Sequence, residues 1–155
     1  MKTIVTVCLC LLIAVAARAD FQMPESVYRM DRLEEAKTAA KHNGSAITII
    51  FTHEKTSCSL CKTASLKAAA TLGVKTVVVY VNADNEWRKV PAAAQNALSS
   101  PEAGRFVPKT IITDSDMTKV FAIVPYADGD EYDRLLQAAL KKLPDGAEKS
   151  DVKSK

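Results

Sequence analysis

Short apolar runs alternate with amphipathic segments along this chain, and the alternation predicts strands separated by helices. The runs are rich in β-branched residues, which is typical of buried strands. They cover Ala46 to Thr52, Lys75 to Val81, Lys109 to Thr113 and Lys119 to Val124. Helical spacing or helix-favouring composition predicts the segments around them. The expected helices cover residues 30–43, 58–72, 86–99 and 130–143.

Capping and breaking residues mark several ends of these elements. Asp31 stands three residues before Glu34, much as in a capping box, and can cap the first helix. Pro91 breaks or starts the 86–99 segment. Residues 114–117 form a turn that joins the last two strands as a hairpin. Strands alternating with helices imply a parallel core, and the hairpin adds antiparallel pairing. The expected fold is therefore α/β, with a central mixed sheet flanked by helices.

The first residues differ in character from the rest of the chain. Lys2 supplies a positive start, Ile4 to Ala17 is almost wholly apolar, and Ala17-Arg18-Ala19 is a small-x-small cleavage site. These features predict a signal peptide that is cut after Ala19. The apolar run is short for a membrane anchor, which needs about 20 residues. The expected organisation is a signal peptide over residues 1–19, one domain over 20–144 and a polar, disordered tail over 145–155.

Removing this leader changes two counts that bear on function. The 155-residue chain keeps 136 residues, and the loss of Lys2 and Arg18 leaves 19 of its 21 basic residues against 18 acidic ones. A domain so near neutrality gives no electrostatic reason to expect nucleic acid or a membrane surface as partner. The four cysteines become two, Cys58 and Cys61. An exported protein meets oxidising conditions, so a disulfide between them is permitted.

Cys58 and Cys61 are separated by two residues, and three interpretations of the pair are open. A structural disulfide closing so short a loop would add little stability through loop entropy. A structural zinc site needs four ligands, and only His42 and His53 could add imidazole. A redox centre needs the two thiols alone, because one attacks a disulfide and the other resolves the product. The redox interpretation is favoured, ahead of an inert disulfide and then a metal site.

The chain resembles thioredoxin-fold proteins over nearly its whole expected mature length. The C-x-x-C pair follows the strand Ala46 to Thr52 at a helix start, Phe106-Val107-Pro108 stands just before a later strand, and a helix closes the domain. The chain departs from the family at Ser57, where thioredoxins usually have tryptophan, and at Ser59-Leu60 in place of Gly-Pro. An equivalent of the family's buried aspartate is not obvious either. These departures keep open the alternative of a non-catalytic binding module with a structural disulfide.

The position of the pair at a helix start assigns different roles to the two cysteines. The free amides and positive dipole end of a helix favour an anion, so Cys58 is expected to be the nucleophile and Cys61 the resolving thiol. The resemblance implies that Val107-Pro108 is cis, faces the pair and presents the Val107 backbone to a substrate segment. His53 and Lys62 are candidate modulators of the thiolate.

Together these features predict an exported thiol–disulfide oxidoreductase, periplasmic or secreted. Its expected partners are cysteine-containing exported proteins or a redox partner protein, without nucleic acid and without a stable membrane anchor after cleavage. No bound cofactor is expected, because the dithiol itself carries two electrons. The sequence does not distinguish an oxidant from a reductant or an isomerase.

Overall fold

The computed structural model describes residues 22–144. The predicted signal peptide, its cleavage after Ala19 and the predicted tail over 145–155 lie outside the described residues. The described part forms a five-stranded sheet with the strand order β1-β3-β2-β4-β5. The strands are β1 (Tyr28–Arg29), β2 (Ala46–Thr52), β3 (Thr76–Asn82), β4 (Lys109–Thr113) and β5 (Val120–Val124).

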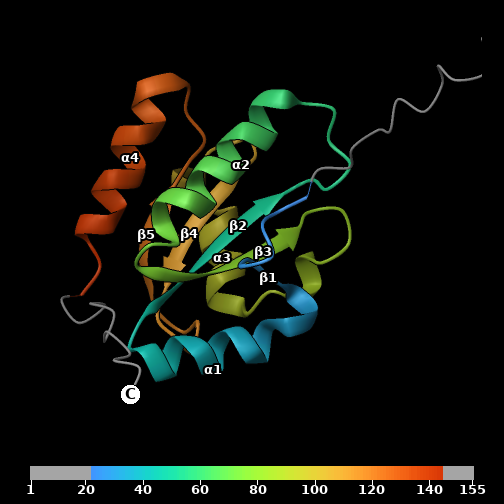
Figure 1. The fold of residues 1–155 in the computed structure, drawn as a ribbon. Coiled ribbons are helices and arrows are strands. Elements are labelled where there is room, and N and C mark those ends of the chain that lie inside the picture. Colours follow the sequence, from blue (N-terminus) through green and yellow to red (C-terminus); the bar gives the residue numbers. More distant parts are fainter. Residues whose placement is uncertain (1–21, 145–155) are drawn as a thin grey trace, which may run out of the picture.

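The sheet is mixed, as the sequence predicted. Strands β1, β3 and β2 run parallel to one another, β4 pairs antiparallel with β2, and β5 pairs antiparallel with β4. Because of this pairing, the carboxyl ends of β2, β3 and β5 lie at the same edge of the sheet as the start of β4. Figure 1 shows the loop that leaves β2 at this edge and leads into α2.

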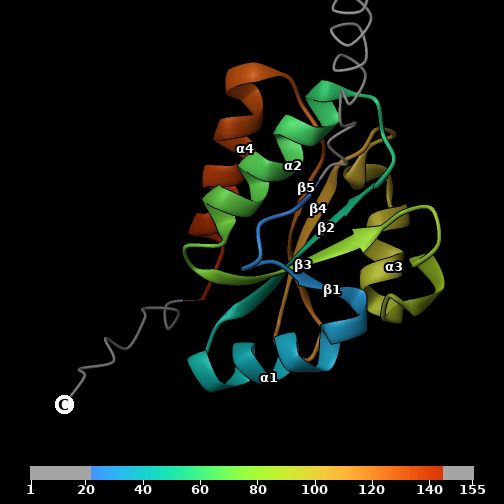
Figure 2. The ribbon, with the colours of Figure 1, turned by 45° about the vertical axis from the view of Figure 1, so that its right-hand side comes forward.

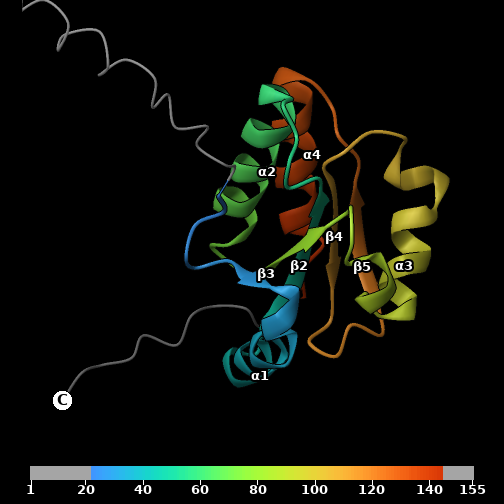
Figure 3. The same cartoon turned by 90° about the vertical axis from the view of Figure 1, so that its right-hand side faces the viewer.

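Helices cover both faces of the sheet. They are α1 (Leu33–Asn43), α2 (Ser59–Leu72), α3 (Ala92–Ser99) and α4 (Gly129–Lys141). Figure 3 shows α2 and α4 together on one face and α3 on the other. Helices α2 and α4 lie side by side (Figure 2), and the Lys67 ammonium lies 2.6 Å from the Asp133 carboxylate between them. This arrangement confirms the predicted α/β class, with a central mixed sheet flanked by helices.

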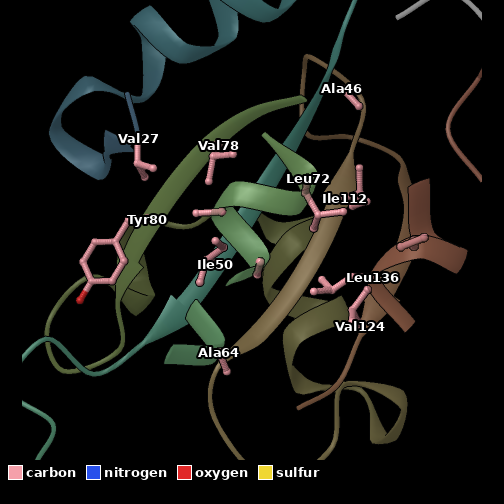
Figure 4. Packing of buried hydrophobic residues seen from close by; sticks show 14 of the residues in the cluster. Val27, Ala46, Ile50, Ala64, Leu72, Val78, Tyr80, Ile112, Val124 and Leu136 are labelled. Carbon is pink, nitrogen blue, oxygen red and sulfur yellow. The ribbon is translucent and has the colours of Figure 1, made fainter. Parts of the chain in front are cut away.

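Alternate residues of β2 pack into two separate apolar layers. Ile50 belongs to the layer under α2 and α4, whereas Ile47 and Ile49 belong to the layer with α1 and α3. Since neither face of the strand meets water, β2 is a continuous apolar run and does not alternate with polar residues. Figure 4 shows the first layer, which is built from Ile50, Leu72, Ile112, Val124 and Leu136. Burying each such side chain stabilises the fold by about 1.5–3 kcal/mol.

Some predicted element ends are wrong. Asp31 lies inside a short 3-10 turn, Met30–Arg32, and Arg32 occupies the position before α1, so the predicted capping by Asp31 does not occur. Pro91 divides the predicted 86–99 helix into a 3-10 turn, Trp87–Lys89, and α3. Strand β1 was not predicted, because no pattern in the sequence indicates it. Across residues 22–144, every helix is too short or too polar to span a bilayer.

Candidate functional site

Cys58 and Cys61 lie at the start of α2, where the chain arrives from the carboxyl end of β2. Strand β2 ends at Thr52, and residues 53–58 lead to Ser59, the first helical residue. Cys58 is the N-cap of the helix, with the extended backbone angles φ −71° and ψ 106°. This edge of an open α/β sheet is where such folds usually place their sites. Cys61 follows one helical turn later, so both side chains meet at the same end of α2.

The two sulfurs are in direct contact. Both residues are free thiols, and the Cys61 Sγ–H donates to the Cys58 Sγ across 2.7 Å. The Cys61 backbone N–H also donates to the Cys58 Sγ, at 3.2 Å. Cys58 therefore caps the helix with sulfur, in the place where serine or aspartate would use oxygen. Its own backbone N–H donates to the Thr56 hydroxyl oxygen at 3.1 Å, which fixes the residue just before the helix.

These contacts shift the pKa values of the two thiols in opposite directions. The pKa of Cys58 is lowered from its ordinary value of 9.0, first by the hydrogen bond from the Cys61 thiol and then by the Cys61 and Leu60 amides. Burial raises the pKa of Cys61 to about 11, and the neighbouring Cys58 sulfur adds to the rise. Of the two thiols, Cys58 is therefore the one that ionises first, and Cys61 is the one that stays protonated as its donor.

The Val107-Pro108 peptide bond is cis, which confirms that prediction. Pro108 is buried, Val107 is half-buried, and the next residue, Lys109, begins β4. Lys109 pairs with Phe51 near the carboxyl end of β2, so Pro108 stands at the sheet edge from which the Cys58 loop departs. The substrate-binding role of Val107 and Pro108 stays a prediction.

The two candidate modulators lie in different surroundings. The His53 ring turns to the loop after β3, where its Nδ1 lies 2.6 Å from the Asp84 Oδ1. Lys62 is half-buried in the first turn of α2. Within the described part of the chain, the groups that lower the pKa of Cys58 belong to Cys61 and Leu60. A modulating role for His53 or Lys62 therefore stays a prediction.

Tyr126 belongs to this edge of the sheet, and the sequence analysis missed it. It follows β5, whose Val124 pairs with Thr110 near the start of β4. The Tyr126 hydroxyl donates to the Asp128 Oδ1 at 2.6 Å. This bond and burial raise the pKa of Tyr126 to about 12, and the charges of Cys61 and Cys58 add to the rise. The order of strands brings this tyrosine near the thiols, and no spacing in the sequence indicates it.

Two large apolar side chains at this edge are exposed to solvent. Leu60, between the cysteines, is 62% exposed, and Phe106, two residues before Pro108, is 72% exposed. Among residues 22–144, His, Cys, Asp and Glu side chains form no group of three or more that could hold a metal ion.

Comparisons with known proteins leave the site to be interpreted from its own geometry. No protein-family model and no curated protein sequence matches the chain. A crystal structure of a disulphide isomerase from Xylella fastidiosa Temecula1 is similar, with a TM-score of 0.49 and 16% sequence identity. The match covers 76% of this chain and 97% of the isomerase chain. Two chains this different in sequence need not share an activity. The fold of this chain is assigned from its own strand order.

Proposed function

We propose that this protein is an exported thiol–disulfide oxidoreductase that acts on cysteines of other exported proteins through a Cys58/Cys61 couple. The observation that carries the proposal is the contact between two free thiols, 2.7 Å apart, at the start of α2. The thiolate is the attacking form of a cysteine, and the lowered pKa of Cys58 raises its thiolate fraction above that of an ordinary cysteine. A resolving thiol must wait within reach, and Cys61 does so in its protonated form.

The proposed reaction uses the two sulfurs in sequence. The Cys58 thiolate attacks one sulfur of a substrate disulfide, the new S–S bond forms a mixed disulfide, and the other substrate sulfur leaves as a thiolate. Cys61 then loses its proton and attacks the Cys58 sulfur. A Cys58–Cys61 disulfide forms and the second substrate thiolate leaves, so two electrons have passed to the substrate. The reverse sequence oxidises a substrate dithiol.

Single-thiol variants test the proposal. Cys61→Ser keeps the attacking thiol and loses resolution, so mixed disulfides with exported proteins should accumulate and disappear on addition of reductant. Cys58→Ser should trap few partners. Both variants are expressed with their own leader and compared by non-reducing electrophoresis. Equal trapping by the two variants would contradict the assigned roles and favour a non-catalytic binding module.

Export is a separate part of the proposal and rests on the sequence of residues 1–19. The intact mass of exported protein should correspond to a chain that begins at Asp20. Retention of Met1 in a membrane-associated form would contradict it. Export would place the couple among proteins whose own cysteines form disulfides, which supplies the substrates that the proposed chemistry needs.

A further inference from the structure

The loop between β2 and α2 is tied to the sheet through the side chain of Glu54. The Glu54 Oε1 accepts hydrogen bonds from Nη1 and Nη2 of Arg29, each at 3.0 Å. Its Oε2 accepts from the Nδ2 of Asn82 at 2.9 Å. Arg29 is the last residue of β1 and Asn82 is the last residue of β3. One carboxylate therefore fastens the loop that carries Cys58 to two strands.

The partners of Glu54 are themselves held in place. Asn82 is 6% exposed, and its Oδ1 accepts from the backbone N–H of Asp84 at 3.0 Å. Because both ends of this amide are engaged, only one orientation of the Asn82 side chain satisfies its bonds. The Arg29 guanidinium lies 5.4 Å from the centre of the Tyr80 ring. Figure 4 shows that ring at the margin of the apolar layer, with its oxygen directed away from Ile50.

Neighbouring residues add ties at the same end of β3. The Ala83 N–H donates to the Thr52 carbonyl oxygen at 2.9 Å, and the His53 ring contacts Asp84 at 2.6 Å. Beyond Glu54, only residues 55–57 separate these contacts from Cys58, so the position of Cys58 is restricted by a short segment. A short chain segment that is fixed at its start restricts where its end can lie.

We propose that Glu54 is a positioning residue for the thiol pair: clamped by Arg29 and Asn82, it holds the loop so that the Cys58 sulfur stays on the Cys61 amide. This inference rests on the proposed function of the pair. A helix N-terminus stabilises an anion only within its first turn, so a loop that lets Cys58 leave the cap loses that stabilisation. Glu54 acts through the loop and is not assigned a contact with the substrate.

The first test removes the carboxylate and measures the reactivity of Cys58. In the full mature chain, Glu54→Ala should slow alkylation of Cys58 by iodoacetamide at pH 7 by about fivefold, the effect expected when the Cys58 sulfur loses its hydrogen bond from the Cys61 N–H. Mass spectrometry identifies the alkylated cysteine. Glu35→Ala is the matched control, because Glu35 on α1 makes a similarly close ion pair with Arg32, the residue just before that helix, at 2.6 Å. The control should react like the wild type.

A second test exchanges the hydrogen-bonding groups between positions 54 and 82. Glu54→Gln leaves one oxygen, which can accept from Arg29 but not also from Asn82. Asn82→Asp places a second carboxylate next to that of Glu54, and the two repel each other. Each single change should slow alkylation. In the double variant, the new amide at 54 faces a carboxylate at 82, which can still accept from the Asp84 N–H. The double variant should recover most of the lost rate, which is a non-additive result.

The outcomes separate this inference from the proposed function. If wild-type Cys58 reacts no faster than an unstructured cysteine, the proposed function itself is wrong. If the wild type is reactive and all three single variants at positions 54 and 82 match it, only the positioning role is wrong. Loss of thermal stability with unchanged alkylation per folded molecule also contradicts positioning. Should Glu54→Ala fail to fold, the Gln and exchange variants decide the question.

Discussion

The thiol of Cys61 should be a measurable part of what makes Cys58 reactive. Cys61 offers two donors to the Cys58 sulfur, its Sγ–H at 2.7 Å and its backbone N–H at 3.2 Å. Cys61→Ala removes the first donor and leaves the second, whereas Cys61→Ser replaces a thiol donor with a hydroxyl donor of similar reach. The alanine variant should therefore have a smaller thiolate fraction at Cys58 than the serine variant near neutral pH.

The size of the difference follows from the loss of one hydrogen bond at a site that water can reach. Water competes for the half-buried Cys58 sulfur, so the lower part of the usual range for a hydrogen bond, about 0.5–1 kcal/mol, applies, and alkylation should slow about two- to fivefold. The two variants should converge at high pH, because Cys58 is then ionised in both. The retained amide bond should keep the alanine variant more reactive than a free cysteine peptide.

The assay is the rate of iodoacetamide alkylation against pH, on chains that begin at Asp20 so that Cys8 and Cys10 are absent. Each variant then has one thiol, and urea unfolding shows whether the two are equally folded. Identical pH profiles for the alanine and serine variants would refute the reasoning, because the Cys61 side chain would then contribute nothing to the Cys58 thiolate. A faster alanine variant would refute it as well.

Further predictions concern stability. The reduced protein should lose stability in urea as pH rises from about 9 to 11. Burial raises the pKa of Cys61 to about 11, so in this range the folded chain keeps a proton that the unfolded chain has lost. The stabilisation from the lowered pKa of Cys58 is already complete above 9.0 and does not change over this range. Asp114→Ala should lower the free energy of unfolding by about 1–2 kcal/mol, because the Asp114 carboxylate accepts from two backbone amides and a hydroxyl in the β4–β5 turn. The control Asp116→Ala, at an exposed position of the same turn, should change it by less than about 0.5 kcal/mol. Leu136→Ala should cost about 2–5 kcal/mol in urea unfolding, because its side chain is fully buried.

The strands that sequence predicted best are those buried on both faces. The bounds of β2 and β4 agree with the prediction, because polar or turn-forming residues flank continuous apolar runs. Strand β1 was missed because it has only two residues, Tyr28 and Arg29, and its strand character comes from pairing with Val79 and Tyr80 of β3. No periodicity can be recognised in two residues. Only the tertiary pairing defines this strand.

The helix ends show where a capping residue in the sequence does not predict the conformation of the backbone. The sequence offered Asp31 as a cap, but the chain makes a 3-10 turn there and α1 starts only at Leu33. Helix α1 ends at residue 43 as predicted, and Gly44 follows it with φ +61°, a left-handed conformation that glycine adopts without steric penalty. Pro91 was recognised as a break or a start, and it is the residue immediately before α3.

The candidate site likewise has features that the sequence predicts and features that it does not. The cysteine pair, its place at a helix start and the cis Val107-Pro108 bond could be predicted, because each depends on neighbours in sequence or on a family motif. Glu54 and Tyr126 could not, because their partners come from other strands or loops. Arg29 reaches Glu54 only because β1 lies beside β3, and Tyr126 comes near the thiols only because β5 ends at their edge.

The asymmetry of the thiol pair comes from the fold more than from the spacing of the cysteines. Cys58 lies outside the helix, in extended conformation, so its sulfur can turn back and accept the amide of Cys61. Cys61 lies inside the first turn, where its sulfur can only donate to Cys58, and burial keeps it protonated. If the helix began one turn earlier, both cysteines would be helical and the Cys58 sulfur would lose the amide that it caps. The C-x-x-C spacing allows the two sulfurs to meet, and the start of α2 at Ser59 decides which of the two thiols has the lowered pKa.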